Sequence, residues 1–132
     1  MIFKQVFDEK SSTYTYLIAS SHGREAVIID PVLENVDSYI KILNDLDLKL
    51  VKVIDTHIHA DHVTGASKLK NLTKCSTIMG EHTPADTVEI KVKDDEIISL
   101  DNLKIRAMYT PGHTSDSFSF LMDNYLFPGI HC

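Results

Sequence analysis

The sequence has few cysteines, and the two it has, Cys75 and Cys132, cannot form a disulfide framework. It lacks an apolar stretch of the roughly 20 residues that a membrane-spanning helix needs. Its first residues alternate and then turn acidic, unlike a signal peptide. There is no basic run and the formal net charge is −6, which argues against a nucleic-acid surface. We therefore expect a cytoplasmic protein with neither membrane nor nucleic acid among its partners.

The 132 residues, 43% of them hydrophobic and 24% charged, fit a single globular domain over 1–132 with a buried core. Alternating or β-branched runs predict strands at 2–7, 13–19, 26–29, 50–54, 76–79, 97–100, 103–109, 117–122 and 125–127. Apolar residues three and four apart predict two helices, 36–46 through Val36, Ile40, Leu43 and Leu46, and 66–72 through Ala66, Leu69 and Leu72. This alternation predicts an α/β layered fold.

A cluster of histidines follows the predicted buried strand 50–54. His57, His59 and His62 lie within six residues, together with Asp61. His57 and His59 point the same way if the chain stays extended, because side chains alternate with a period of two. Imidazole suits zinc and iron, and a carboxylate adds charge and orientation. A single histidine here would indicate only a solvated loop, but three with an aspartate predict a metal site.

A second element supports this prediction. The segment Tyr109-Thr110-Pro111-Gly112-His113-Thr114 follows another predicted strand, and Pro-Gly forms a tight turn that presents His113. Alone it would indicate only a turn. Together with the first cluster, it makes His113 the expected next ligand.

These residues together resemble the metallo-β-lactamase superfamily, through a complete His-x-His-x-Asp-His motif. The resemblance implies a sandwich of two sheets with helices on both outer faces (αββα), of which this chain is the N-terminal part, with the second half largely missing. Within the superfamily, Ala60 before the aspartate and Thr64-Gly65 after the motif are similar to the persulfide dioxygenases. The segment 110–114 fits both that group and glyoxalase II.

The persulfide dioxygenase resemblance implies one Fe(II) ion held by His57, His113 and a later aspartate. Such a set leaves positions open for substrate and oxygen. It implies oxidation of a small persulfide, typically glutathione persulfide, to sulfite and the thiol. His59, Asp61 and His62 would surround the metal, and we expect Asp61 to be the catalytic residue.

Two other functions stay open. A glyoxalase II-like thioester hydrolase would bind two metals, such as Zn(II), with His57, His59 and His113 on one ion and Asp61 and His62 on the other. A non-catalytic metal-binding or interaction module is the third possibility, favoured by the missing half.

The ending departs from the family pattern, in which a strand leads to Phe-Thr-Gly-Asp and the aspartate binds metal. Here Ile130 occupies that position, followed by His131 and Cys132. The codons GGA GAT ACA TTG T, which specify Gly-Asp-Thr-Leu, become codons for Gly-Ile-His-Cys on loss of one G. We therefore hypothesise a frameshifted or otherwise truncated relative, with Zn(II) on three histidines as an alternative to iron.

Truncation would expose inner-face side chains and strand edges, so we expect self-association through an exposed sheet surface. The remaining candidates have simpler explanations. We expect Cys75 to be a buried core residue, and Cys132 and His131 to be exposed. His22 and His82 lie in predicted turns and loops, where solvated side chains are the rule.

Overall fold

The computed structural model describes residues 1–21, 23–57, 65–84, 88–112, 115–122 and 125–128. Its strands are β1 (Ile2–Asp8), β2 (Thr13–Ala19), β3 (Glu25–Ile29), β4 (Lys49–Ile54), β5 (Ser76–Gly80), β6 (Ile90–Val92), β7 (Ile97–Leu100), β8 (Leu103–Tyr109), β9 (Phe118–Met122) and β10 (Tyr125–Phe127). The helices are the 3₁₀ turn η1 (Leu33–Asn35), α1 (Val36–Asp45) and α2 (Ala66–Thr73). None of the helices in this described part is long and apolar enough to cross a membrane.

The first sheet has the strand order β1-β2-β3-β4-β5-β6. β1, β2 and β3 pair antiparallel, whereas β3, β4, β5 and β6 run parallel. The carboxyl ends of these four parallel strands therefore lie at one edge of the sheet. Ala26 to Ile29 are fully buried, as expected of a parallel strand covered on both faces.

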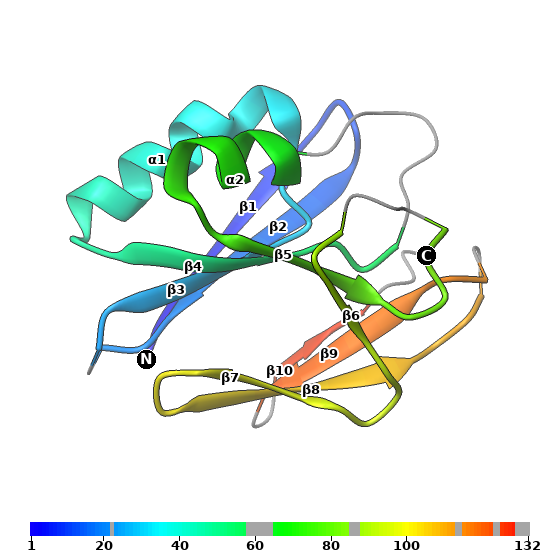
Figure 1. Ribbon diagram of the computed structural model, residues 1–132. Coiled ribbons are helices and arrows are strands. Elements are labelled where there is room, and N and C mark those ends of the chain that lie inside the picture. The colour runs from blue at the N-terminus through cyan, green and yellow to red at the C-terminus, as the bar shows by residue number, and fades with distance from the viewer. Residues whose placement is uncertain (22, 58–64, 85–87, 113–114, 123–124, 129–132) are drawn as a thin grey trace.

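The second sheet has the order β10-β9-β8-β7 and is antiparallel throughout. Its inner face packs on the first sheet and encloses one apolar cluster, which includes Ile29, Ile54, Phe118, Phe120 and Phe127. Figure 1 shows the two sheets as separate layers. The apolar cluster lies between them.

The two α-helices, α1 and α2, cover the other face of the first sheet (Figure 1). Val36, Tyr39 and Leu43 of α1 and Leu69 of α2 enter a second buried cluster there. The layers are thus helix, sheet, sheet, which confirms the α/β sandwich. The described residues place no helix on the outer face of the second sheet, where the family pattern has its second helical layer.

Three details differ from the sequence-based expectations. Tyr39, not Ile40 or Leu46, lies with Val36 and Leu43 on the buried face of α1, because its hydroxyl finds buried hydrogen-bond partners. Leu72 of α2 is 57% exposed, and only Ala66 and Leu69 of this helix are buried. The short edge strand β6 was not predicted, because three residues are too few to show the alternation of apolar and polar side chains that marks a strand.

Candidate metal centre

The two segments that carry the candidate ligands begin at neighbouring places in the fold. The Phe118 amide donates a hydrogen bond to the Thr56 carbonyl oxygen at 2.8 Å, which joins the start of β9 to the residue before His57. The Thr110 amide donates to the Ser117 carbonyl at 3.0 Å. Figure 1 shows the end of β4 and the β8–β9 connection on the same side of the molecule.

Chain length limits how far the predicted ligands lie from this junction. Position 113 is three residues after Thr110, and an extended chain spans at most about 3.6 Å per residue. Position 59 is only two residues after His57. The backbone therefore allows both predicted ligand segments to reach one metal ion.

Of the predicted metal ligands, only His57 belongs to the described part of the chain, where it is half-buried. His59, Asp61, His62 and His113 lie outside the described residues. Among the residues that are described, no group of three histidine, cysteine or acidic side chains could hold a metal ion. The complete ligand set thus stays a prediction.

The surroundings of His57 fit a metal ligand. Its Nδ1 lies 2.9 Å from the Thr56 hydroxyl oxygen. The Thr56 hydroxyl and amide donate to the two carboxylate oxygens of Asp30, at 2.7 and 2.8 Å. Metal-binding histidines characteristically have their second ring nitrogen engaged by such a group, which orients the ring. Asp30 and Thr56 are almost fully buried, so little water competes for these bonds.

The sequence analysis did not place Asp30 in this centre, because it drew the candidate ligands from the histidine motif and the Pro-Gly turn. The signal was present in the sequence. Asp30 follows the wholly apolar run 26–29, and an acidic residue next to such a run is buried only where it has hydrogen-bond donors. Two further carboxylates near the junction, Asp55 and Asp116, are also buried.

His82 follows β5 at the same sheet edge and is exposed. Its ring lies 4.2 Å, centroid to centroid, from that of Tyr109, and the ring of Tyr109 lies 5.4 Å from Phe118. The Tyr109 hydroxyl donates to the Ser115 carbonyl at 2.7 Å. His82 is therefore exposed to solvent, as expected. Its neighbour Tyr109 is the last residue of β8, and Phe118, which contacts Tyr109, is the first residue of β9.

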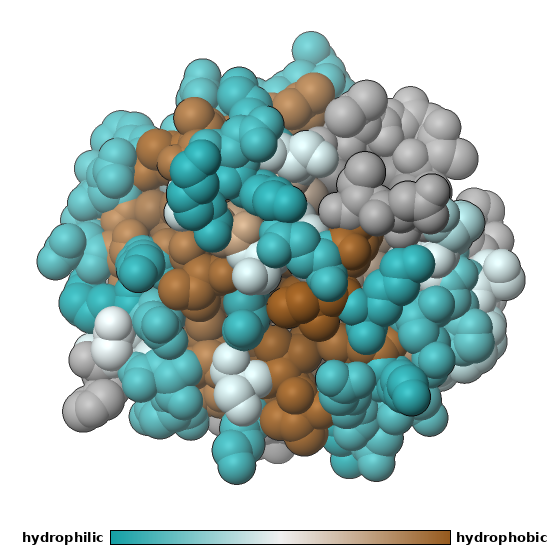
Figure 2. Space-filling view, in the orientation of Figure 1, coloured by the Kyte–Doolittle hydropathy of each residue, from teal (hydrophilic) through white to brown (hydrophobic). Residues whose placement is uncertain are grey.

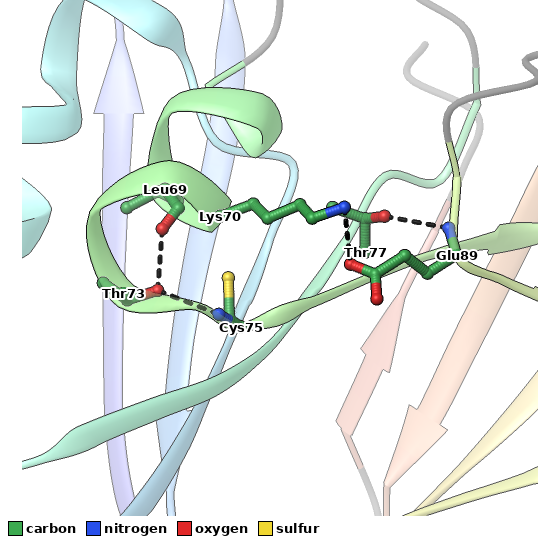
Figure 3. A network of polar contacts seen from close by, with 6 residues as sticks. All are labelled: Leu69, Lys70, Thr73, Cys75, Thr77 and Glu89. Atoms are coloured by element: carbon green, nitrogen blue, oxygen red, sulfur yellow. Dashed lines mark hydrogen bonds and ion pairs between the residues drawn. The ribbon is translucent and has the colours of Figure 1, made fainter.

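Cys75 is 3% exposed, which confirms it as a core residue. Figure 3 shows its amide donating to the Thr73 hydroxyl, which in turn donates to the Leu69 carbonyl. In the same view Lys70 pairs with Glu89 at 2.9 Å. Burial raises the pKa of the Cys75 thiol, and the Thr73 hydroxyl opposes this only in part. A protonated, buried thiol is a poor nucleophile and metal ligand.

Comparisons with known proteins agree with this geometry. A family model described as the metallo-β-lactamase superfamily matches residues 9–129. The mitochondrial persulfide dioxygenase ETHE1 of Bos taurus is 32% identical over 126 residues, covering 95% of this chain and 49% of the relative. The crystal structure of ETHE1 from Myxococcus xanthus superposes with a TM-score of 0.92 at 41% identity, covering 96% of this chain and 56% of that one.

A probable hydroxyacylglutathione hydrolase of Schizosaccharomyces pombe is 36% identical over 109 residues, covering 81% of this chain and 42% of the relative. The chain thus spans about half the length of the curated relatives it matches.

Proposed function

The chain belongs to the metallo-β-lactamase superfamily, and from this premise we propose that it is the metal-binding part of a persulfide dioxygenase. The substrate class is a small persulfide of the glutathione type. The reaction converts persulfide, O₂ and water into thiol and sulfite, with release of two protons. The outer sulfur is oxidised and O₂ is reduced.

One observation carries the proposal. The hydrogen bond from the Phe118 amide to the Thr56 carbonyl brings the His57 strand end next to the β8–β9 connection. A metal ion shared by His57 and His113 requires this approach. The likeness to the bovine and Myxococcus proteins, both named as ETHE1, favours persulfide chemistry over the superfamily's other reactions.

The proposed ligands are His57 and His113, with His59, Asp61 and His62 around them and Asp61 as the catalytic residue. The metal, Fe(II) in this proposal, supplies positions where persulfide and oxygen react side by side. The chain's own part is to hold the imidazoles in place. Nδ1 of His57 lies 2.9 Å from the Thr56 hydroxyl oxygen.

Position 130 is isoleucine in this chain, whereas the family pattern has a metal-binding aspartate there. With His57, His59 and His113 as donors, the site is also suited to Zn(II), which commonly has three protein ligands and one open position. We therefore keep zinc as the alternative metal. Residues 129–132 lie outside the described residues.

The second candidate is a two-metal thioester hydrolase, favoured by the 36% identity to the fission-yeast protein. Elemental analysis separates the two candidates. We expect about one iron ion per chain, whereas two zinc ions per chain would support the hydrolase.

Activity assays distinguish the dioxygenase from the hydrolase independently of the metal content. We expect oxygen uptake with glutathione persulfide and no hydrolysis of lactoyl-glutathione. A metal-loaded chain that catalyses neither reaction would support the third reading, a non-catalytic metal-binding module.

The proposal also covers the domain organisation, the self-association and the cellular location of the chain. We propose that residues 1–132 form a single domain unit that self-associates through exposed sheet surface. We also propose a cytoplasmic location, although the bovine relative is described as mitochondrial. Fractionation of cells that express the natural protein distinguishes these locations.

A further inference from the structure

Two sets of hydrogen bonds, one from helix α1 and one from His57, meet at Asp30. The Thr15 hydroxyl donates to the Asp30 carbonyl at 2.7 Å. The Tyr39 hydroxyl lies 3.0 Å from the Thr15 oxygen. Because Thr15 uses its single hydrogen on Asp30, Tyr39 must donate to Thr15. The Tyr39 oxygen accepts in turn from the Val32 amide at 3.1 Å.

These bonds hold Asp30 in an unusual backbone conformation. Its φ is +56°, in the left-handed region that L-residues rarely adopt. The Asp30 amide donates to the Ile54 carbonyl at 2.7 Å, while its own carbonyl is held by Thr15. Asp30 is therefore fixed on both sides, with its carboxylate directed at Thr56.

The direction of the next bonds determines where the His57 proton lies. A hydroxyl has one hydrogen, and Thr56 donates its hydrogen to the Asp30 carboxylate, which can only accept. The Thr56 oxygen must then accept from His57, so the proton is on Nδ1. This tautomer leaves the lone pair, and with it the capacity to bind a metal, on Nε2.

We propose that Asp30 and Thr56 are positioning residues that fix His57 as its Nδ1–H tautomer, and that Tyr39 and Thr15 support them by holding the Asp30 backbone. The inference rests on the proposed function in that His57 is a metal ligand. It goes further in assigning a role to four residues outside the metal-binding motif. The site is thereby prepared before the metal arrives.

Replacing Asp30 by asparagine gives an unusual prediction. The asparagine oxygen can still accept from the Thr56 amide, but its NH₂ group now donates to the Thr56 oxygen. The Thr56 hydroxyl must then donate to His57 Nδ1, and the ring proton moves to Nε2. An aspartate-to-asparagine change gives the wrong histidine tautomer by the same logic in catalytic triads.

Long-range ¹H–¹⁵N spectra of the metal-free, full-length chain test this directly. They are recorded at alkaline pH and assigned through the signals lost in His57→Gln. We expect the His57 proton on Nδ1 in the wild type and in Thr56→Ser, and on Nε2 in Asp30→Asn. A wild-type proton on Nε2, or a folded Asp30→Asn with its proton still on Nδ1, overturns the proposal.

Thr56→Val and Thr56→Ser form a matched pair if Asp30→Asn does not fold. The first removes only the hydroxyl and the second restores it. Thr56→Val should shift the His57 proton towards Nε2, and unchanged spectra in Thr56→Val would overturn the proposal. Thermal unfolding of each variant separates a local change from loss of the fold.

Zinc affinity, measured by competition with a chelator, gives a second readout. Loss of such an orienting partner typically weakens metal binding 10- to 100-fold, which we expect for Asp30→Asn and Thr56→Val but not for Thr56→Ser. Equal zinc affinities in the wild type and in these three variants would contradict the positioning role. A wild type with the expected tautomer that oxidises no persulfide would overturn only the proposed activity.

Discussion

At the scale of single residues, the polar groups buried near the candidate site form hydrogen bonds of defined direction. Asp30, Thr15 and Thr56 are each at most 2% exposed, and each has hydrogen-bond partners. An unpaired buried polar group would cost about 1–3 kcal/mol. The same bonds that avoid this cost also orient His57, so stability and site geometry depend on the same atoms.

Cys75 provides a prediction of pH dependence at this scale. Burial raises the pKa of its thiol, so the folded chain holds this proton more tightly than the unfolded chain does. Above the ordinary thiol pKa of about 8.5, the unfolded state ionises first and gains stability. The free energy of unfolding should therefore fall as the pH rises through this alkaline range.

Urea unfolding at several alkaline pH values measures this slope in a Cys132→Ser background, which leaves one thiol. Adding Cys75→Ala should make the slope shallower. Tyr16, whose pKa is also raised by burial, leaves a residual slope in both proteins. Identical slopes would show that Cys75 has the same pKa in both states.

At the scale of elements, the close approach of β5 and β9 determines how the two sheets meet near the site. A Cβ added at Gly80 would lie 2.0 Å from Cδ1 of Phe118. Phe118 is fully buried, and its amide makes the bond to Thr56. Only glycine therefore allows the end of β5 to lie against this ring.

We predict that Gly80→Ala destabilises the chain by about 1–3 kcal/mol, as overpacking in a filled core does. Gly23→Ala is the matched control, because its Cβ would meet the flexible carboxylate end of Asp101. Chemical denaturation of both variants compares the two costs. A Gly23→Ala variant as unstable as Gly80→Ala would contradict this account of the β5–β9 contact.

The long elements were predictable because burial imposes a repeating pattern on them. The strand at 103–109 and the helix beginning at Val36 appear as expected. The role of Tyr39 was not predictable, since its hydroxyl contacts Thr15, which lies 24 residues away in the sequence. The bond between Phe118 and Thr56 likewise depends on how the sheets pack, which no local pattern specifies.

At the scale of the whole molecule, exposed apolar side chains lie on several surfaces. Leu126 of the edge strand β10 is 53% exposed and Ile97 of the edge strand β7 is 49% exposed. Figure 2 shows further apolar residues gathered beside α1 and α2. Ile40, Leu48 and Leu72 line a groove of about 410 Å³.

We predict that the chain self-associates through the outer edge of β10, which no strand of the described residues covers and which carries the exposed side chain of Leu126. Light scattering should give a mass above that of one chain. Leu126→Lys should lower the mass, because a charge on an edge strand opposes pairing. Leu72→Lys, away from that edge, is the control. A sharply monomeric wild type would exclude the prediction.

The central claim is that imidazoles from two separate strand ends bind one metal ion. X-ray absorption spectroscopy of the iron-loaded chain measures this most directly, by counting imidazole ligands around the iron. We predict two or more in the wild type and in His82→Ala, and one fewer in each of His57→Ala and His113→Ala. An imidazole count that neither substitution changes would contradict the account.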